Sequence, residues 1–293
     1  MSSSDTPQFE PPSGVDTGLP ADANDTVTLP VEALAEGLSP SPVSPPPRDP
    51  VWSGWDVLLI ALLTIVTLIL AEFVTVLVAW GIFYRHSNFR DLVQRPVLDL
   101  LGEVLGYIAV ATYMIMLLEG KYHAPFWKAI RWNWNGKAAP KLLGLGVLTV
   151  GLDLLSRYLP MPKTTPFEQF FSHPADAYLV AVFAVSLGPL MEELFFRGFL
   201  YPVLARRTGV FAAVLFTALP FGLMHYLQYR SWGAVLVITL VGIVLTVVRV
   251  LTESVAASFL VHVGYNATLM VLAAVATDGF RHMDKAVLLP SFR

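Results

Sequence analysis

The sequence contains no cysteine. This absence excludes disulfide bonds, thiolate metal ligands and a cysteine nucleophile, and it excludes palmitoylation or prenylation of the chain itself. Charged residues are also scarce, because they make up 14% of the 293 positions, whereas soluble domains carry about 25%. The composition therefore argues against a soluble globular protein and against any chemistry that depends on a thiol.

Apolar residues are correspondingly abundant in the sequence. They account for 55% of the chain, and the mean hydropathy is +0.61. Apolar runs of about 20 residues recur along the sequence, which predicts an all-α fold: a polytopic membrane helix bundle of seven or eight helices. The expected partner is thus the lipid bilayer. Nothing in the charge pattern indicates nucleic-acid binding.

The chain divides into four parts by composition. Residues 1–50 hold eleven of the 22 prolines and eight acidic residues against one arginine, which predicts a disordered Pro/Ser/acidic tail. We expect N-terminal membrane helices and an interfacial segment over 51–159, a membrane core with the polar motifs described below over 160–280, and a C-terminal tail over 281–293. The dense basic and aromatic loop within 119–141 favours a cytosolic N-terminus in a bacterial plasma membrane, although Lys and Arg are nearly balanced between alternate loops.

The apolar runs predict membrane helices over 55–83, 96–118, 141–159, 175–206, 210–229, 232–251 and 254–276. Gly188-Pro189 should break the fourth of these helices, and Pro220 should kink the fifth. The acids in the first two helices, such as Glu103, are interpreted as structural. Arg249 and Glu253 have the i, i+4 spacing of an ion pair.

The fourth apolar run carries two acids and a base, at Glu192, Glu193 and Arg197. A charge at the bilayer centre costs about 2.5–3.5 kcal/mol on insertion scales, so these groups must pair, contact water or perform chemistry. Glu193 and Arg197 have the i, i+4 spacing of a helical ion pair. Glu192 is rotated about 100° from Glu193 on a helix. We therefore expect Glu192 to face a cavity, where it could act as a general base.

Two later helices also carry polar side chains suited to catalysis. His225 follows Phe221 by four positions, and His262 precedes Asn266 by four. A single buried histidine or asparagine in a membrane helix most often has a structural role. All of these residues fall within the last 102 positions, on the fourth, fifth and seventh predicted helices. That concentration favours one shared site.

The three motifs together resemble those of a known family. Glu-Glu-x-x-x-Arg at 192–197, Phe-x-x-x-His at 221–225 and His-x-x-x-Asn at 262–266 are similar to the motifs of the CPBP family. That family comprises the type II CAAX prenyl endopeptidases and the bacterial bacteriocin-processing or immunity (Abi) proteins. The flanking Arg-Gly-x-Leu at 197–200 also matches, and the resemblance covers roughly 175–275.

The resemblance implies an intramembrane endopeptidase. Glu192 and His225 would activate a water molecule, and His262 with Asn266 would form the oxyanion hole. Glu193 and Arg197 would hold the geometry of the site. The substrate would be a membrane-bound or lipidated protein, such as a prenylated CAAX protein, and the cavity would open to the cytosol and toward lipid.

Three alternatives remain open from the sequence. Glu192, His225 and His262 could supply a His2Glu zinc site, but there is no His-Glu-x-x-His motif, so we favour a metal-independent site without a firm cofactor. A non-proteolytic membrane scaffold or immunity protein could keep the same architecture. A transporter could use Glu192 and His225 as a proton relay, although no inverted repeat supports it. The sequence does not determine the oligomeric state.

Overall fold

The computed structural model describes residues 49–162, 165–171, 173–283 and 285. All regular elements within these residues are helices, which confirms the predicted all-α fold class. The predicted N-terminal tail lies outside the described residues, apart from its last two positions. Most of the predicted C-terminal tail lies outside them as well.

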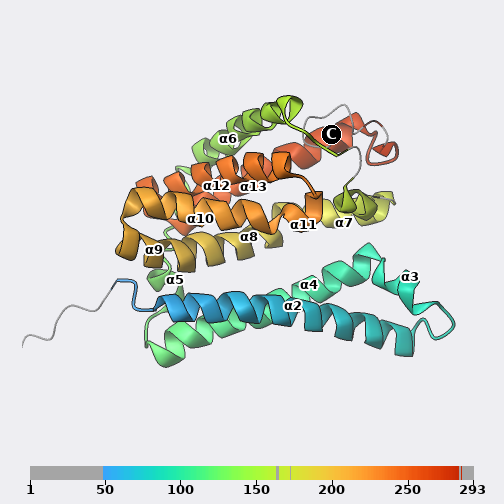
Figure 1. Cartoon of the computed structure of the whole chain (residues 1–293), viewed down its shortest axis with the longest axis horizontal. Helices are drawn as coiled ribbons and strands as arrows, with labels where there is room; N and C mark the ends of the chain where they lie inside the picture. Colours follow the sequence, from blue (N-terminus) through green and yellow to red (C-terminus); the bar gives the residue numbers. More distant parts are fainter. Residues whose placement is uncertain (1–48, 163–164, 172, 284, 286–293) are drawn as a thin grey trace, which may run out of the picture. The chain divides into compact units, whose positions relative to one another are not determined.

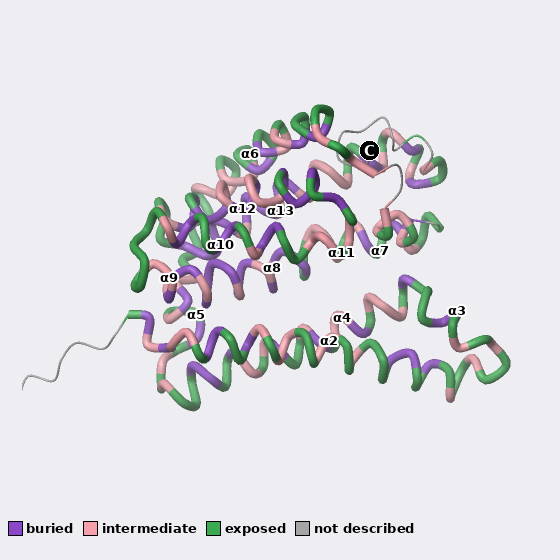
Figure 2. Tube along the Cα trace, viewed as in Figure 1, coloured by how far each residue is buried: buried purple, intermediate pink, exposed green. Residues whose placement is uncertain are grey.

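Within the described part of the chain, seven helical segments are long and apolar enough to cross a membrane, so the protein is an integral membrane protein. These spans are Gly54–Ile82, Pro96–Lys121, Ala139–Tyr158, Pro174–Thr208, Val210–Tyr229, Trp232–Thr252 and Val255–Ala276. They agree with the seven predicted helices to within a few residues. The first span is the least buried and the sixth the most (Figure 2), so the first span presents most of its apolar surface to lipid.

The first two spans form a hairpin. Helix α2 (Gly54–Ile82) and helix α4 (Pro96–Met116) lie side by side, joined through the short helix α3 (Phe89–Val93) (Figure 1). Gly102 of α4 permits this close approach, because a Cβ atom there would lie 2.7 Å from the Cα of Glu72 in α2.

The hairpin is attached to the rest of the bundle where α2 begins and the second span ends. The indole of Trp52 is buried and donates a hydrogen bond to the carbonyl of Phe199 at 3.0 Å. Asp56 accepts hydrogen bonds of 2.6 Å from Lys121, in the π-helical segment η1 (Leu117–Lys121), and from Tyr122. Burial and the hydrogen bond to Asp56 raise the pKa of the Tyr122 phenol. These contacts fix the end of the hairpin from which α2 starts.

The remaining elements form the core that contains the polar motifs. In chain order they are α5 (Phe126–Ala129), α6 (Ala139–Thr149), the 3₁₀ segments η2 (Val150–Tyr158) and η3 (Pro166–Phe171), α7 (Pro174–Val185), α8 (Leu187–Glu193), the π-helical segment η4 (Leu194–Leu200), α9 (Tyr201–Thr208), α10 (Val210–Met224), α11 (Tyr226–Tyr229), α12 (Trp232–Thr252) and α13 (Val255–Ala276). The third span changes from α-helix to 3₁₀-helix after Thr149. The fourth span contains four successive helical segments.

The spans alternate between two ends of the molecule. At the first, which we call the tail end, Arg131 pairs with Asp49 at 2.6 Å and with Glu253 at 2.8 Å. The predicted pair between Arg249 and Glu253 is therefore wrong. Glu253 has a left-handed backbone with φ of 50°, which ends α12 and turns the carboxylate toward Arg131.

The opposite end, which we call the distal end, is closed by aromatic contacts. Phe167 lies 5.7 Å from Tyr229 between ring centroids, and Phe171 lies 5.6 Å from Phe280. These contacts join the loop before α7, the end of the fifth span and the segment after α13. With seven spans, the start of α2 and the end of α13 lie at opposite ends.

Candidate active site

The fourth span is broken just before the two acids, but not where the sequence suggested. Helix α7 ends at Val185 and α8 begins at Leu187, because Ser186 leaves helical geometry with φ −119° and ψ −83°. Gly188 and Pro189 belong to the first turn of α8, so the predicted break at Gly188-Pro189 is wrong by two residues. A proline is tolerated there, because a backbone N–H in the first turn has no partner within the helix.

Glu193 and Arg197 form a fully buried ion pair. Both side chains are 0% exposed, and Arg197 Nη1 donates to Glu193 Oε1 at 2.8 Å. The guanidinium also donates to the carbonyl of Gly242 at 2.8 Å and to the hydroxyl of Thr246 at 3.3 Å, and it lies 4.5 Å from the ring centre of Phe221. A buried charge must be paired and hydrogen-bonded. Arg197 meets that requirement by tying the fourth span to α12.

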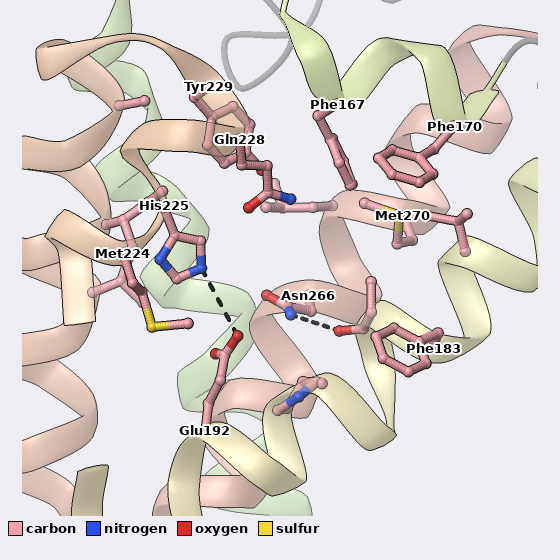
Figure 3. Close-up of a pocket in the computed structure, with 18 of the residues that line it drawn as sticks. Phe167, Phe170, Phe183, Glu192, Met224, His225, Gln228, Tyr229, Asn266 and Met270 are labelled. Carbon is pink, nitrogen blue, oxygen red and sulfur yellow. Dashed lines mark hydrogen bonds and ion pairs between the residues drawn. The ribbon is translucent and has the colours of Figure 1, made fainter. Parts of the chain in front are cut away.

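Glu192 points the other way, into a cavity. Its side chain is 16% exposed, and it lies below His225 in Figure 3. Oε1 lies 3.9 Å from His225 Nε2, and Oε2 lies 3.7 Å from His262 Nε2. Both distances exceed the usual hydrogen-bond length of about 2.7–3.2 Å. The carboxylate and the two imidazoles therefore surround a small space instead of bonding directly.

His225 is positioned by a change of helix. Helix α10 runs through Pro220 and ends at Met224, and His225 precedes the short helix α11. Its Nδ1 lies 2.8 Å from the carbonyl of Phe221. A carbonyl only accepts hydrogen bonds, so Nδ1 carries the proton. Nε2 of the ring faces Glu192.

His262 is held by the second acid. Its Nδ1 lies 3.0 Å from Glu193 Oε1, and its side chain is 5% exposed. A carboxylate accepts the hydrogen bond, so Nδ1 again carries the proton. His262 therefore connects the buried pair of Glu193 and Arg197 to the space beside Glu192.

Asn266, one turn after His262 on α13, contacts the fourth span just before its break. Its Nδ2 donates to the carbonyl of Ala184, in the last turn of α7, at 2.7 Å (Figure 3). The amide carries a second N–H, which this bond leaves available at the cavity. The structure thus brings Glu192, His225, His262 and Asn266 together.

These four residues line one cavity of about 530 Å³. Its walls come mostly from apolar and aromatic side chains such as Phe170, Phe183, Met224 and Met270 (Figure 3). The lining segments of α4, α10, α12 and α13 lie toward the distal end, and η3 at that end also contributes. The cavity therefore extends from the middle of the bundle to the distal end.

The cavity lining also contains two polar pairs that the sequence motifs did not reveal. On α4 the Tyr107 hydroxyl donates to Glu103 at 2.8 Å, and on the opposite wall the Tyr265 hydroxyl donates to Asp153 at 3.2 Å. Glu103 was predicted to have a structural role, since it lies in the first half of its helix. The i, i+4 spacing of Glu103 and Tyr107 in an apolar helix was the available signal.

The zinc alternative can be compared with this geometry. Within the described ranges, no group of three or more His, Cys, Asp or Glu side chains is arranged to hold a metal ion. Nδ1 of His262 contacts Glu193 and Nδ1 of His225 contacts a backbone carbonyl, which are contacts that metal-bound histidines also make. We assign no catalytic step to zinc.

The comparisons with known proteins agree with the motif resemblance. A family model for the Rce1-like type II CAAX prenyl endopeptidases matches residues 174–268. This range includes all three motifs, so residues 174–268 are similar to this family, and the predicted resemblance is confirmed. The match supports endopeptidase activity in the membrane in general terms. Searches of curated proteins and of solved structures gave no significant match.

Proposed function

We propose that the protein is an intramembrane endopeptidase that hydrolyses a peptide bond of a membrane-associated substrate with a water molecule activated by Glu192 and His225. The observation that carries the proposal is the convergence of Glu192, His225, His262 and Asn266, from three spans, on one cavity. A scaffold would not need a carboxylate and two imidazoles to surround a gap of 3.7–3.9 Å. Gaps of this size between polar groups are commonly bridged by water.

The first step is attack by water on the peptide carbonyl. Water donates one proton toward Glu192 and a hydrogen bond toward the Nε2 lone pair of His225. As its oxygen bonds to the carbonyl carbon, that proton moves to Glu192, and the carbonyl becomes a tetrahedral oxyanion. When the intermediate collapses, the carbon–nitrogen bond breaks and the protonated Glu192 returns the proton to the leaving amine. Water is consumed, and a carboxylic acid and an amine are released.

His262 and Asn266 are suited to stabilise the oxyanion. Because Nδ1 of His262 donates to Glu193, a hydrogen bond from Nε2 to the substrate requires the imidazolium form. The second N–H of Asn266 would be the other donor. Donors placed in advance for developing charge act strongly in a water-poor site.

The substrate class follows from the cavity and the family. An apolar cavity inside the membrane suits a membrane-bound or lipidated peptide, and the matched family suggests a prenylated CAAX-like protein. We propose that the reaction needs no metal. The alternative of a non-proteolytic scaffold or immunity protein is favoured by no contact among the described residues.

The decisive experiment compares purified wild-type protein with Glu192→Gln in a peptide-cleavage assay. The substitution keeps size and hydrogen-bonding capacity but removes the base, so we expect kcat to fall by at least about 10²-fold. Glu72→Gln is the matched control, since it is the same change in a membrane helix away from the cavity lining, and it should retain activity. Undiminished cleavage by Glu192→Gln would refute the mechanism, and loss of activity on complete metal removal would restore the zinc alternative.

A further inference from the structure

The helix bundle contains a second buried arginine, and its surroundings differ from those of Arg197. Arg249 lies on α12 at the tail end, three residues before the last residue of that helix, and it is 3% exposed. Arg197 has an ion pair and two further hydrogen bonds. Arg249 forms no ion pair with another described residue, and its Nε is buried without a hydrogen-bond partner. A buried guanidinium in this state is costly unless an anion accompanies it.

The acids nearest to Arg249 are engaged by another arginine. The charged side chains that act on Arg249 are Arg131, Glu253 and Asp49. Arg131 lies 2.8 Å from Glu253 and 2.6 Å from Asp49, and the left-handed backbone of Glu253 directs its carboxylate toward Arg131. Arg249 therefore adds a positive charge that no described side chain neutralises by direct contact.

Tyr201, at the start of α9, provides a second donor beside Arg249. The guanidinium carbon of Arg249 lies 5.6 Å from the centre of the Tyr201 ring, and Tyr201 is 7% exposed. A buried tyrosine hydroxyl usually finds a hydrogen-bond partner. The side-chain hydrogen bonds that the fourth span donates within the described residues include none from this hydroxyl. Two neighbouring donor side chains thus lack an acceptor.

These two side chains lie near a membrane boundary. The apolar helix α12 ends three residues after Arg249, and Trp127 and Trp134 are exposed in the loop at the same end, as is typical of the lipid headgroup region. The anion that a membrane supplies at this depth is lipid phosphate, and basic sites between helix ends bind anionic headgroups. Arginine suits this ligand because its guanidinium presents parallel N–H donors to phosphate oxygens.

We propose that Arg249 and Tyr201 form a binding site for the phosphate group of an anionic phospholipid at the tail end of the bundle. The phosphate supplies the missing anion and accepts hydrogen bonds from the guanidinium and from the Tyr201 hydroxyl. The long side chain of Arg249 lets the guanidinium extend toward the headgroup while α12 stays in place. The bound lipid then links α12 to α9, which ends the span that carries Glu192. Neither residue lines the cavity, so the inference does not depend on the proposed peptidase activity.

The first test measures thermal unfolding of delipidated protein in neutral detergent micelles, with and without phosphatidylglycerol. Without lipid, Arg249→Met should be at least as stable as the wild type, because it removes a buried charge that has no partner. Arg197→Met should lose stability under the same conditions, because it leaves Glu193 buried alone. Phosphatidylglycerol should raise the Tm of the wild type by about 2–4 °C and should leave that of Arg249→Met nearly unchanged.

The second test measures the apparent Kd for phosphatidylglycerol by native mass spectrometry. Arg249→Met should weaken binding by at least about tenfold and Tyr201→Phe by about threefold, since they remove a charge-assisted and a neutral hydrogen bond. Arg249→Lys should lie between Arg249→Met and the wild type, because it keeps the charge but loses the parallel donors. Arg207→Met is the control: it removes an exposed arginine at the same end and should stay within about twofold of the wild type.

Phosphatidylcholine and inorganic phosphate identify the source of the phosphate. Phosphatidylcholine should bind the wild type more weakly than phosphatidylglycerol, because its ammonium group compensates its phosphate, and inorganic phosphate at the same concentration should not change the Tm. Equal protection by inorganic phosphate would overturn a lipid as the ligand. Lipid stabilisation that persists in full in Arg249→Met would overturn the site. So would a loss of stability in lipid-free Arg249→Met as large as that of Arg197→Met, since it would show that Arg249 already has a partner within the protein.

Discussion

At the scale of single residues, two adjacent glutamates have opposite surroundings. Glu193 is 0% exposed and contacts both Arg197 and His262, whereas Glu192 faces the cavity at 16% exposure. The rotation of about 100° between successive helical residues produces this division. The buried acid and its arginine orient His262, and the cavity acid is left free for proton transfer. A substitution at Glu193 should therefore affect the orientation of His262, whereas a substitution at Glu192 should affect proton transfer.

Removal of Arg197 should destabilise the fold. We expect Arg197→Met to cost about 3–5 kcal/mol of unfolding free energy, because it leaves Glu193 buried without its partner. The double variant Glu193→Gln/Arg197→Met should cost less than the single one. Arg207→Met is the matched control, since Arg207 is exposed in the same span, and it should lie within about 0.5 kcal/mol of wild type. Unfolding in detergent micelles measures all three, and equal stability of Arg197→Met and Arg207→Met would contradict the buried-pair argument.

At the scale of helices, the spans themselves were predictable from the sequence. Long apolar runs have few alternatives in a membrane, so all seven spans were found within a few residues of their observed limits. The positions at which helical geometry is interrupted within a span were not predictable. Ser186 breaks the fourth span although serine is no strong helix breaker, and the Gly188-Pro189 pair that looked like the break fits inside the first turn of α8. Tertiary contacts, such as the bond from Asn266 to Ala184, accompany the break.

The sequence also predicted only part of the candidate site. Glu192, His225 and His262 could be grouped because polar groups in apolar helices are rare and must find one another. Glu103 obeys the same rule, yet its side of α4 could not be assigned. The face of α4 that lines the cavity depends on how the α2–α4 hairpin packs against α7. Apolar helices surrounded by lipid have little periodicity in their hydrophobic pattern, so the sequence does not indicate this face. The contact between Tyr107 and Phe183 supplies the missing information.

The crossing of α6 and α13 depends on two glycines. A Cβ atom on Gly146 would overlap the carbonyl of Val261 and lie 2.8 Å from the Cα of Gly264. We expect Gly146→Ala to cost about 1–3 kcal/mol through overpacking, and to lower activity by shifting the helix that carries His262. A Cβ atom on Gly144, half a turn away, would meet nothing within 4 Å. Gly144→Ala should therefore be neutral or stabilise α6 by about 0.5–1 kcal/mol.

Thermal unfolding and peptide cleavage of the two alanine variants provide the measurement. The variants differ by two positions on the same helix and by the same methyl group, so intrinsic helix propensity cancels between them. Equal stabilities would show that α6 and α13 are not in close contact through Gly146.

At the scale of the whole molecule, the position of the cavity bears on the predicted topology. The sequence suggested a cytosolic N-terminus and a cavity open to the cytosol. The structure places the start of α2 at the tail end and the lining residues of the cavity toward the distal end. A cavity that opens at the distal end would receive its substrate from the side of the membrane opposite the start of α2. The near balance of Lys and Arg between alternate loops does not decide which side is cytosolic.

The absence of cysteine makes this arrangement directly testable, because any single introduced cysteine is the only thiol in the chain. Lys128→Cys reports on the tail end and His86→Cys on the distal end, and both positions are exposed. Gln228→Cys reports on the cavity lining. We expect a membrane-impermeant maleimide to label Lys128→Cys from one side of sealed vesicles and His86→Cys from the other. A small water-soluble maleimide should reach Gln228→Cys from the His86 side, and protection by a bound peptide would link that access to the substrate path. Labelling of Gln228→Cys from the Lys128 side would instead place the cavity mouth at the tail end, and it would reverse the inferred direction of substrate entry.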